Sequence, residues 1–353
     1  MSAPLHHVRI VGAGLIGTSI GLALRKRDIA VTMVDSSDAA QALAQDLLNI
    51  PASQSPADLV IFALPISAIS SVIENEYLQN LNATFIDISS VKVKVINEVK
   101  SSSLPSSRFL PTHPMAGREV GGAQSARGDL FQDRPWIYDP EGVDGDVLRN
   151  GLALIELCGG HPVALASQDH DEAVAAISHL PQLLASLLAR SLHGLQPSAL
   201  DLAGSGLRDT TRIAGSDPKL WREILSANNQ ALLPLLKAVS VDLSELIAHL
   251  DDPDFIEKFI EGGNSGRNLI PGKHGGVARK YTYLPVVIED KPGQLAALFD
   301  LCAEAGVNVE DLSIEHSPEQ FTGLITLALS SSDADTLYNH LLKSGWRVHE
   351  ARS

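Results

Sequence analysis

Residues 7–35 read HVRIVGAGLIGTSIGLALRKRDIAVTMVD. The first five residues predict a buried strand, the glycine-rich segment predicts a tight turn, and the remainder predicts a helix and a second strand that ends at Asp35. Gly12, Gly14 and Gly17 have the G-x-G-x-x-G spacing. In such a unit the first glycine permits the turn, the second lets backbone approach a pyrophosphate, and the third permits close packing of helix on strand. The stretch therefore predicts a dinucleotide-binding (Rossmann) unit.

The same stretch also predicts which dinucleotide binds. Leu15 and Ile16 open the helix, whose N-terminal amides attract phosphate charge. Asp35 stands 23 residues after Gly12, where an acid accepts hydrogen bonds from the adenosine ribose and repels a 2′-phosphate. The segment DSSDAA that begins at Asp35 contains no arginine to receive such a phosphate. We therefore expect NAD as the cofactor.

Further strands are predicted at ADLVIFALP (57–65), ATFIDISS (83–90) and PWIYD (135–139), with helical patterns between them. This alternation predicts a parallel sheet of βαβ units. Ala63 and Pro65 end the first of these strands at the sheet edge that carries the glycine turn. They either line the nicotinamide half of the cofactor or pack the end of the strand.

The sequence pattern changes along the chain, and we expect several domains from it. Residues 1–168 form the α/β Rossmann domain. Residues 169–262 are helical with a surplus of apolar positions, which predicts an all-helical domain that packs against a second subunit or forms a monomeric bundle. Residues 263–281 are rich in glycine and basic residues and predict a linker or an ordered loop. Residues 282–353 follow the order strand, helix, two strands, helix, strand, which predicts a ferredoxin-like α+β domain.

Composition excludes several classes of protein. The chain has 353 residues and a net charge of −15, so a general role on nucleic acid or on a membrane surface is not expected. The only basic patch falls within residues 263–280, which either add positive potential beside an active site or form a solvated linker. The two cysteines are far apart, which favours the reducing cytoplasm. We find no signal-peptide pattern and no uninterrupted apolar run long enough for a membrane span.

Several segments, taken in order, resemble the prephenate dehydrogenase family, which includes arogenate dehydrogenases. After the glycine turn these are DISSVK (87–92), THPMAG (112–117), SHLPQ (178–182) and TRIAGSDPKLW (211–221). The resemblance implies oxidation of a cyclohexadienyl alcohol, with hydride passing to NAD and the ring carboxylate leaving as carbon dioxide. For prephenate the product is 4-hydroxyphenylpyruvate, in tyrosine biosynthesis. We expect a homodimer and no metal.

The reaction requires a proton acceptor beside the reacting hydroxyl, and neutral histidine suits pH 7. His113 precedes Pro114, which forces extended backbone at the histidine. From the residues alone, His113 is more simply a loop histidine. The resemblance makes it the acceptor and makes Ser90 the serine that bonds both this histidine and the substrate hydroxyl, with Ser89 as the rival assignment. Lys92 is expected to be structural or to face solvent.

Three further residues are substrate-site candidates through the resemblance. His179 bonds substrate or is a polar residue on a dimer-facing helix. Arg212 clamps a substrate carboxylate, as a dianion in an acidic protein requires, or forms an ion pair on a helix face. Glu119 gates the active site or is a surface glutamate. Gln182 stands where many relatives carry a second histidine, which affects the choice of substrate.

The C-terminal segment, with EDKPGQLAAL (289–298) and GVNVEDLSI (306–314), resembles an ACT domain, the small amino-acid-sensing module. Amides exposed at the start of the helix after Pro292 and Gly293 suit a ligand carboxylate. Asp290, Pro292, Gly293 and Asn308 are the expected ligand residues, and tyrosine is the expected effector. The alternative is a dimerisation module without a ligand.

Three alternative functions remain. The substrate can be arogenate, which carries an amine where prephenate carries a keto group. A non-catalytic sensor of NAD and an amino acid has no need of a proton acceptor such as His113. A 3-hydroxyacid dehydrogenase of similar build uses a lysine where this chain has His179.

Overall fold

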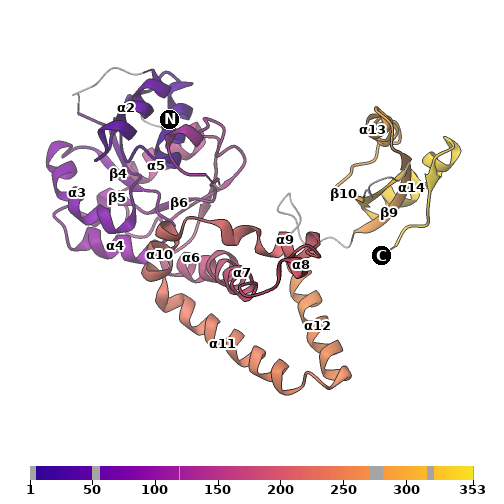
Figure 1. The fold of residues 1–353 in the computed structure, drawn as a ribbon. Helices are drawn as coiled ribbons and strands as arrows, with labels where there is room; N and C mark the ends of the chain where they lie inside the picture. The colour runs from indigo at the N-terminus through magenta and orange to yellow at the C-terminus, as the bar shows by residue number, and fades with distance from the viewer. Residues whose placement is uncertain (1–4, 50–55, 119, 271–280, 316–321, 353) are drawn as a thin grey trace. The chain divides into compact units, whose positions relative to one another are not determined.

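The structure is a computed structural model that describes residues 5–49, 56–118, 120–270, 281–315 and 322–352. The chain divides into two compact units, Met1–Asp242 and Leu243–Ser353 (Figure 1). The first unit carries the glycine turn and the candidate active-site residues.

A five-stranded sheet forms the centre of the first unit. Its order is β2-β1-β3-β4-β5, and every neighbouring pair is parallel. The strand order reverses direction between β1 and β3, and ligands of such sheets bind where this happens, at the carboxyl ends of the strands. The strands are β1 (His7–Val11), β2 (Ala30–Val34), β3 (Leu59–Phe62), β4 (Thr84–Asp87) and β5 (Phe109–Leu110).

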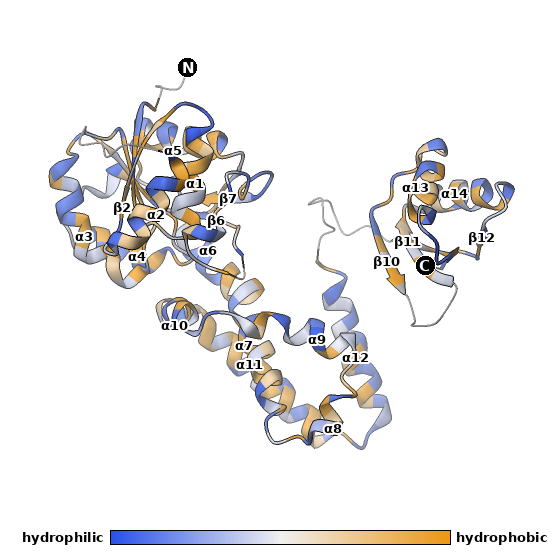
Figure 2. Cartoon of the chain, turned by 45° about the horizontal axis from the view of Figure 1, so that its top comes forward, coloured by the Kyte–Doolittle hydropathy of each residue, from blue (hydrophilic) through white to orange (hydrophobic). Residues whose placement is uncertain are grey.

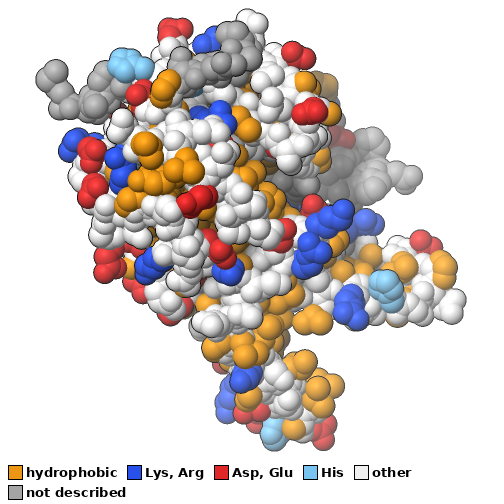
Figure 3. All heavy atoms as spheres, turned by 90° about the vertical axis from the view of Figure 1, so that its left-hand side faces the viewer, with side chains coloured by type: hydrophobic (Ala, Val, Ile, Leu, Met, Phe, Trp, Pro, Cys, Tyr) orange, Lys and Arg blue, Asp and Glu red, His pale blue; other side chains and the backbone are white. Residues whose placement is uncertain are grey.

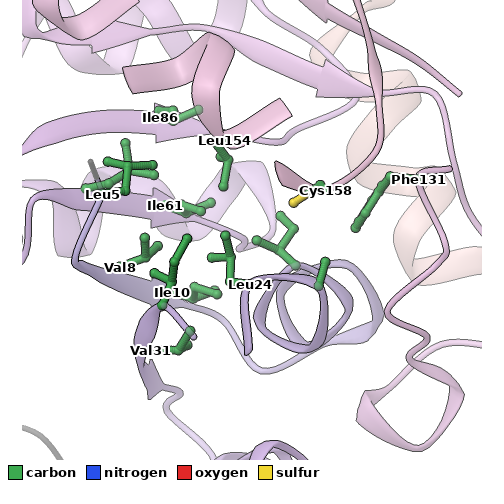
Figure 4. Packing of buried hydrophobic residues seen from close by; sticks show 14 of the residues in the cluster. Leu5, Val8, Ile10, Leu24, Val31, Ile61, Ile86, Phe131, Leu154 and Cys158 are labelled. Atoms are coloured by element: carbon green, nitrogen blue, oxygen red, sulfur yellow. The ribbon is translucent and has the colours of Figure 1, made fainter. Parts of the chain in front are cut away.

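Helices cover both faces of this sheet. Alternate strand residues point to opposite faces, so Leu59 and Ile61 join one core while Val60 and Phe62 join the other. Figure 4 shows the first core, where side chains of β1 and β3 meet Leu24 of α1 and Leu154 of α5. The helices are α1 (Leu15–Arg25), α2 (Asp38–Leu48), α3 (Ile66–Gln79), α4 (Val93–Lys100) and α5 (Gly145–Leu157), with 3-10 turns at Ser106–Arg108 and Ala123–Ser125.

His113 lies in a second, three-stranded sheet that the sequence did not predict as separate. Its order is β6 (Thr112–Pro114), β7 (Pro135–Tyr138), β8 (His161–Ala164), with β6 antiparallel to β7 and β7 parallel to β8. Pro111 separates β5 from β6, and since proline has no N–H to donate, it interrupts the ladder. The backbone at His113 is extended, as the following proline predicts.

The remainder of the first unit is helical, as predicted. Asp217 caps α10 by accepting a hydrogen bond from the Lys219 N–H at 2.9 Å, and Pro218 occupies the first helical position. The elements are α6 (Ser167–Val174), a π-helical turn (Ala175–His179), α7 (Leu180–Ser191), α8 (Pro197–Leu200), α9 (Ser205–Thr211), a 3-10 turn (Arg212–Gly215), α10 (Pro218–Ala227) and α11 (Asn229–Ala248).

The helical stretch Ser167–Ser191 is the one described helix that is long and apolar enough to cross a membrane by length and composition. A helix of an ordinary water-facing protein passes the same test. His170, Asp171 and His179 on this stretch are buried and bonded within the unit. The stretch is therefore accounted for as part of the folded unit.

Apolar side chains are exposed along α7 and α11. Figure 2 shows hydrophobic positions along both helices, and Figure 3 shows hydrophobic side chains gathered over the helical part. On the π-helical turn and α7 they include Ile177, which is 67% exposed, and Leu187, which is 56% exposed. On α11 they are Leu233, Val241, Leu243 and Ile247.

The second unit contains the end of α11, a further helix and a small α+β domain. Helix α12 runs over Pro253–Arg267, so the expectation that a linker begins at residue 263 was wrong: Gly263 and Gly266 lie inside the helix. The rest follows the predicted βαββαβ order, in an antiparallel sheet of order β10-β11-β9-β12. Its elements are β9 (Thr282–Glu289), α13 (Gln294–Glu304), β10 (Asp311–Glu315), β11 (Thr322–Leu329), α14 (Ser331–Lys343) and β12 (Arg347–Val348).

Candidate functional site

The glycine turn has the geometry that its spacing predicts. Gly12 has φ +116°, and a Cβ there would lie 2.1 Å from the Ala63 carbonyl oxygen. A Cβ on Gly17 would lie 2.1 Å from the Gly12 carbonyl oxygen. A Cβ on Gly14 would meet nothing within 4 Å, so this backbone is open to approach. Two glycines are therefore required for packing, and the third leaves space for a ligand.

The groups around the turn suit a dinucleotide. No side chain caps the start of α1, so the amides near the partly exposed Leu15 and Ile16 are free for a phosphate. The Asp35 carboxylate accepts hydrogen bonds from the Ala13 N–H at 2.7 Å and the Ser37 N–H at 2.8 Å. Each carboxylate oxygen has a second lone pair, so this side chain can still accept from a ribose hydroxyl.

Ala63 and Pro65 differ in their surroundings. Ala63 packs directly beneath Gly12 and Gly17, which is a structural role whether or not it also contacts the nicotinamide. Pro65 is exposed and immediately precedes α3. Contact of either residue with the cofactor stays a prediction.

His113 is bonded to a second histidine that the sequence analysis did not single out. The distance from His113 Nδ1 to His170 Nε2 is 2.9 Å, and His170 Nδ1 lies 2.8 Å from Asp171 Oδ1. His170 is fully buried, whereas His113 is partly exposed. Among the described residues no hydrogen bond reaches His113 Nε2, so one ring nitrogen remains available to a ligand.

The surroundings disfavour a positive charge on His113. Its pKa is lowered well below the ordinary 6.5, chiefly by burial. His170, Lys92 and His179 lower it further. A neutral imidazole is the form that can accept a proton, so the site keeps this histidine in the form that a base needs.

Lys92 is buried, so the part of the expectation that allowed it to face solvent was wrong. Its ammonium group donates to the Asp87 carboxylate and, at 2.6 Å, to the Thr112 carbonyl oxygen. Both side chains of the Lys92–Asp87 pair are at most 1% exposed. Burial lowers the pKa of Lys92, although Asp87 and Asp171 oppose the shift. The pair ties the end of β4 to the residue before His113.

Ser90 lies between β4 and α4 and is partly buried. The expected bond to His113 is absent among the described residues, and at Nδ1 the histidine bonds His170 instead. Ser89 is buried, and its hydroxyl has no hydrogen-bond partner in the described part of the chain. A role for Ser90 at the substrate hydroxyl stays a prediction.

His179 lies close to the same cluster. It is buried, its Nδ1 lies 3.2 Å from Asn228 Nδ2, and its ring meets Trp221 edge-on with ring centroids 6.0 Å apart. Burial lowers the pKa of His179 to about 4; the Asp171 carboxylate opposes this shift and His170 adds to it. His179 belongs to a π-helical turn, a feature that is frequent at functional sites.

Arg212 is exposed, on the 3-10 turn that packs against α7. After this turn the Ser216 hydroxyl donates to Gln182 Oε1 at 3.4 Å. Gln182 itself is buried on α7. The segment that carries Arg212 is thus bonded to α7. A contact of Arg212 with substrate stays a prediction.

The remaining candidates divide into two groups. Glu119 lies outside the described residues. In the second unit, Gly293 has φ +89° at the start of α13, whose first turn has no side-chain cap. Asp290 and Pro292 precede it and are exposed. Asn308, which follows α13, is also exposed and donates to Glu310 at 3.1 Å. The loop at Gly293 has amides for an anionic group.

The residues that sequence reasoning missed are His170, Asp171 and Asn228. They are also bonded to one another: the Asn228 amide donates to the Asp171 carbonyl oxygen at 2.7 Å. The sequence held one signal: His170 stands nine residues before His179. His170, Asp171 and His179 therefore share one continuous helical stretch. No group of three or more metal-binding side chains exists in the described residues.

Comparison with known proteins agrees with this geometry. Residues 20–166 match the family model of the prephenate dehydrogenase nucleotide-binding domain, and residues 166–262 match that of its dimerization domain. The chain is 32% identical to a probable prephenate dehydrogenase of Streptomyces niveus, over 96% of this chain and 98% of that protein.

Two solved structures are also similar. A prephenate dehydrogenase of A. aeolicus in complex with hydroxyphenyl propionate and NAD+ is 25% identical, with a TM-score of 0.67 over 76% of this chain and 100% of that chain. An arogenate dehydrogenase of Synechocystis is 28% identical, with a TM-score of 0.63 over 74% of this chain and 98% of that chain.

The buried Lys92–Asp87 pair yields a stability prediction. Lys92→Met removes the cation and leaves the Asp87 charge buried without its partner, so we expect a loss of about 3 kcal/mol in the free energy of unfolding of the first unit. Urea unfolding followed by tryptophan fluorescence measures this. Lys94→Met is the matched control, because Lys94 is 52% exposed in its pair with Glu98 and should cost at most about 1 kcal/mol. Equal losses in the two variants would contradict the prediction.

Proposed function

The chain belongs to the prephenate dehydrogenase family, and on that premise we propose that it oxidises prephenate with NAD and releases carbon dioxide, giving 4-hydroxyphenylpyruvate for tyrosine biosynthesis. The chain is an NAD-dependent oxidoreductase. Relatives that carry the name prephenate dehydrogenase support prephenate as the substrate, while the named arogenate and cyclohexadienyl dehydrogenases make arogenate the rival.

The observation that carries this proposal is the state of His113. It is partly exposed, its pKa is lowered, and one ring nitrogen is bonded to His170 while the other has no partner among the described residues. A secondary alcohol loses hydride readily only when its proton is taken at the same time. A neutral histidine with a free nitrogen supplies that acceptor, which a sensor does not require.

The residues divide the chemistry as follows. His113 accepts the proton of the ring hydroxyl, and Ser90 bonds the same hydroxyl. NAD+, which the glycine turn and Asp35 would hold, would supply the hydride acceptor, and aromatisation would drive the loss of the ring carboxylate. Arg212 and His179 bind the substrate, because a dianion in a protein of net charge −15 needs a local cation and polar partners. Glu119 is proposed to stand at the entrance to the active site.

The proposal includes the assembly and the compartment. The exposed apolar side chains of α7 and α11 support a homodimer in which these helices are covered, in agreement with the dimerization-domain match. Two buried, unpaired cysteines, Cys158 and Cys302, agree with the reducing cytoplasm.

Turnover tests the function directly. The protein with NAD and either prephenate or arogenate should form NADH, faster with prephenate. His113→Asn should lower kcat by about 10³-fold, because a general base is removed, and should leave NAD affinity unchanged. His193→Asn, at an exposed histidine, is the matched control. Absence of turnover with both substrates would refute the enzyme, and an unchanged kcat in His113→Asn would remove this residue from its role.

The lowered pKa of His113 yields a pH prediction. Because an acceptor works only when neutral, a pKa below 6.5 keeps His113 active at pH values where an ordinary histidine is protonated. We expect kcat/KM to stay level as pH falls through 6.5 and to decline only below it. The measurement is initial rate against pH at saturating NAD. A decline centred at or above pH 6.5 would contradict the lowered pKa.

We further propose that residues 282–352 are an ACT domain that binds tyrosine and inhibits the enzyme. The βαββαβ order and the uncapped amides after Gly293 support this. Saturating tyrosine should bind the full-length protein in calorimetry and lower its rate. Asn308→Ala should weaken binding at least about tenfold, whereas Asn339→Ala, at an exposed residue of α14, should not. If tyrosine neither binds nor inhibits, the C-terminal segment is instead a dimerisation module without a ligand.

A further inference from the structure

His170, the buried histidine bonded to His113, has no role in the proposed reaction. His170 lies on α6, is 0% exposed, and has hydrogen-bond partners at both ring nitrogens. Each nitrogen of a buried ring needs a partner, and here one of the two partners is His113 itself. His113, His170 and Asp171 form a continuous chain, with contacts of 2.9 Å and 2.8 Å.

The Asp171 carboxylate fixes the first proton in this chain. Its Oδ1 accepts from the Lys92 N–H at 2.8 Å, and its Oδ2 accepts from the Val93 N–H at 2.9 Å. Both oxygens are thus acceptors, which is the behaviour of an ionised carboxylate. His170 Nδ1, which contacts Oδ1 as well, must therefore be the donor and carry a hydrogen.

The second proton follows from the charges nearby. A neutral His170 with hydrogen on Nδ1 has a lone pair on Nε2, so His113 Nδ1 must donate to it. The alternative is a cationic His170 that donates from Nε2. The groups that face the pair are the Lys92 ammonium and His179 on one side and, on the other, the Asp171 carboxylate, which already accepts hydrogen bonds from two backbone N–H groups. A second buried cation beside Lys92 is costly, so the neutral chain is the favoured one.

We propose that His170 and Asp171 are positioning residues that hold His113 as the tautomer with hydrogen on Nδ1, which leaves Nε2 as the proton acceptor. The inference rests on the proposed function for the identity of the reaction. When the substrate hydroxyl gives its proton to Nε2, His113 becomes an imidazolium; the nicotinamide would be the acceptor for the hydride of the same carbon. The Nδ1–H of His113 stays bonded to His170, whose other side faces the Asp171 carboxylate, so the new charge forms towards a fixed anion.

The tautomer can be measured without any substrate. In the full-length protein labelled with ¹⁵N-histidine, ¹H–¹⁵N correlations distinguish a protonated ring nitrogen from an unprotonated one, and the His113→Asn variant identifies the signals of His113. At pH 7.5 we expect hydrogen on Nδ1 and none on Nε2. Hydrogen on Nε2 in the wild type would overturn the proposal, whatever the variants do.

Kinetics test whether the positioning matters. His170→Leu removes the acceptor for His113 Nδ1, and we expect kcat to fall on the order of 10²-fold. KM for substrate and NAD should stay within about twofold, since His170 is fully buried behind His113. His170→Gln offers an amide oxygen to His113 and should recover part of kcat. His193→Leu, at an exposed histidine in the turn after α7, is the control.

The outcomes separate this inference from the proposed function. Wild-type kcat in both His170 variants would overturn the positioning role even if the enzyme turns over prephenate normally. A wild-type protein that oxidises neither prephenate nor arogenate would refute the function, while the tautomer of His113 would still be read from the spectrum. If His170→Leu fails to fold, the wild-type spectrum and His170→Gln decide the question.

Discussion

The carboxylate of Asp171 is the constraint on which the active-site region depends. It accepts hydrogen bonds from two backbone N–H groups at the start of α4, where the positive end of the helix dipole favours an anion. It also bonds His170. A side chain of α6 thereby fixes the start of a helix of the Rossmann sheet, and the same group orients the histidine behind His113. The Asp171 carboxylate therefore both fixes the start of α4 and orients the histidine that contacts His113.

A buried ion pair, Lys92–Asp87, supports the segment before His113. Lys92 and Asp87 hold Thr112, whose hydroxyl also donates to the Asp87 carbonyl oxygen at 2.6 Å and accepts from Trp136 at 2.9 Å. The backbone before His113 is thus held on several sides. The positive charge of Lys92 also opposes protonation of the histidine. The network that holds the base in position therefore also keeps it neutral.

Much of the fold could be predicted from the sequence because its signals are local. Strand periodicity and the glycine turn each depend on neighbouring residues. The failures had local causes as well. Gly263 and Gly266 favoured a linker but are helical in α12, where helical propensity is only a weak guide. For Lys92 we allowed a solvent-facing position, because the sequence does not reveal that its partner Asp87 is a buried carboxylate.

By itself, the sequence determined the dinucleotide turn, since Gly12 and Gly17 have no room for a side chain, and it determined that His113 is held extended before a proline. Only the tertiary structure decided what surrounds that histidine. Lys92 and Asp171 are 79 residues apart and His113 and His170 are 57 apart. Hydrogen bonds over such separations leave no periodicity in the chain, because they form only when separate elements pack together.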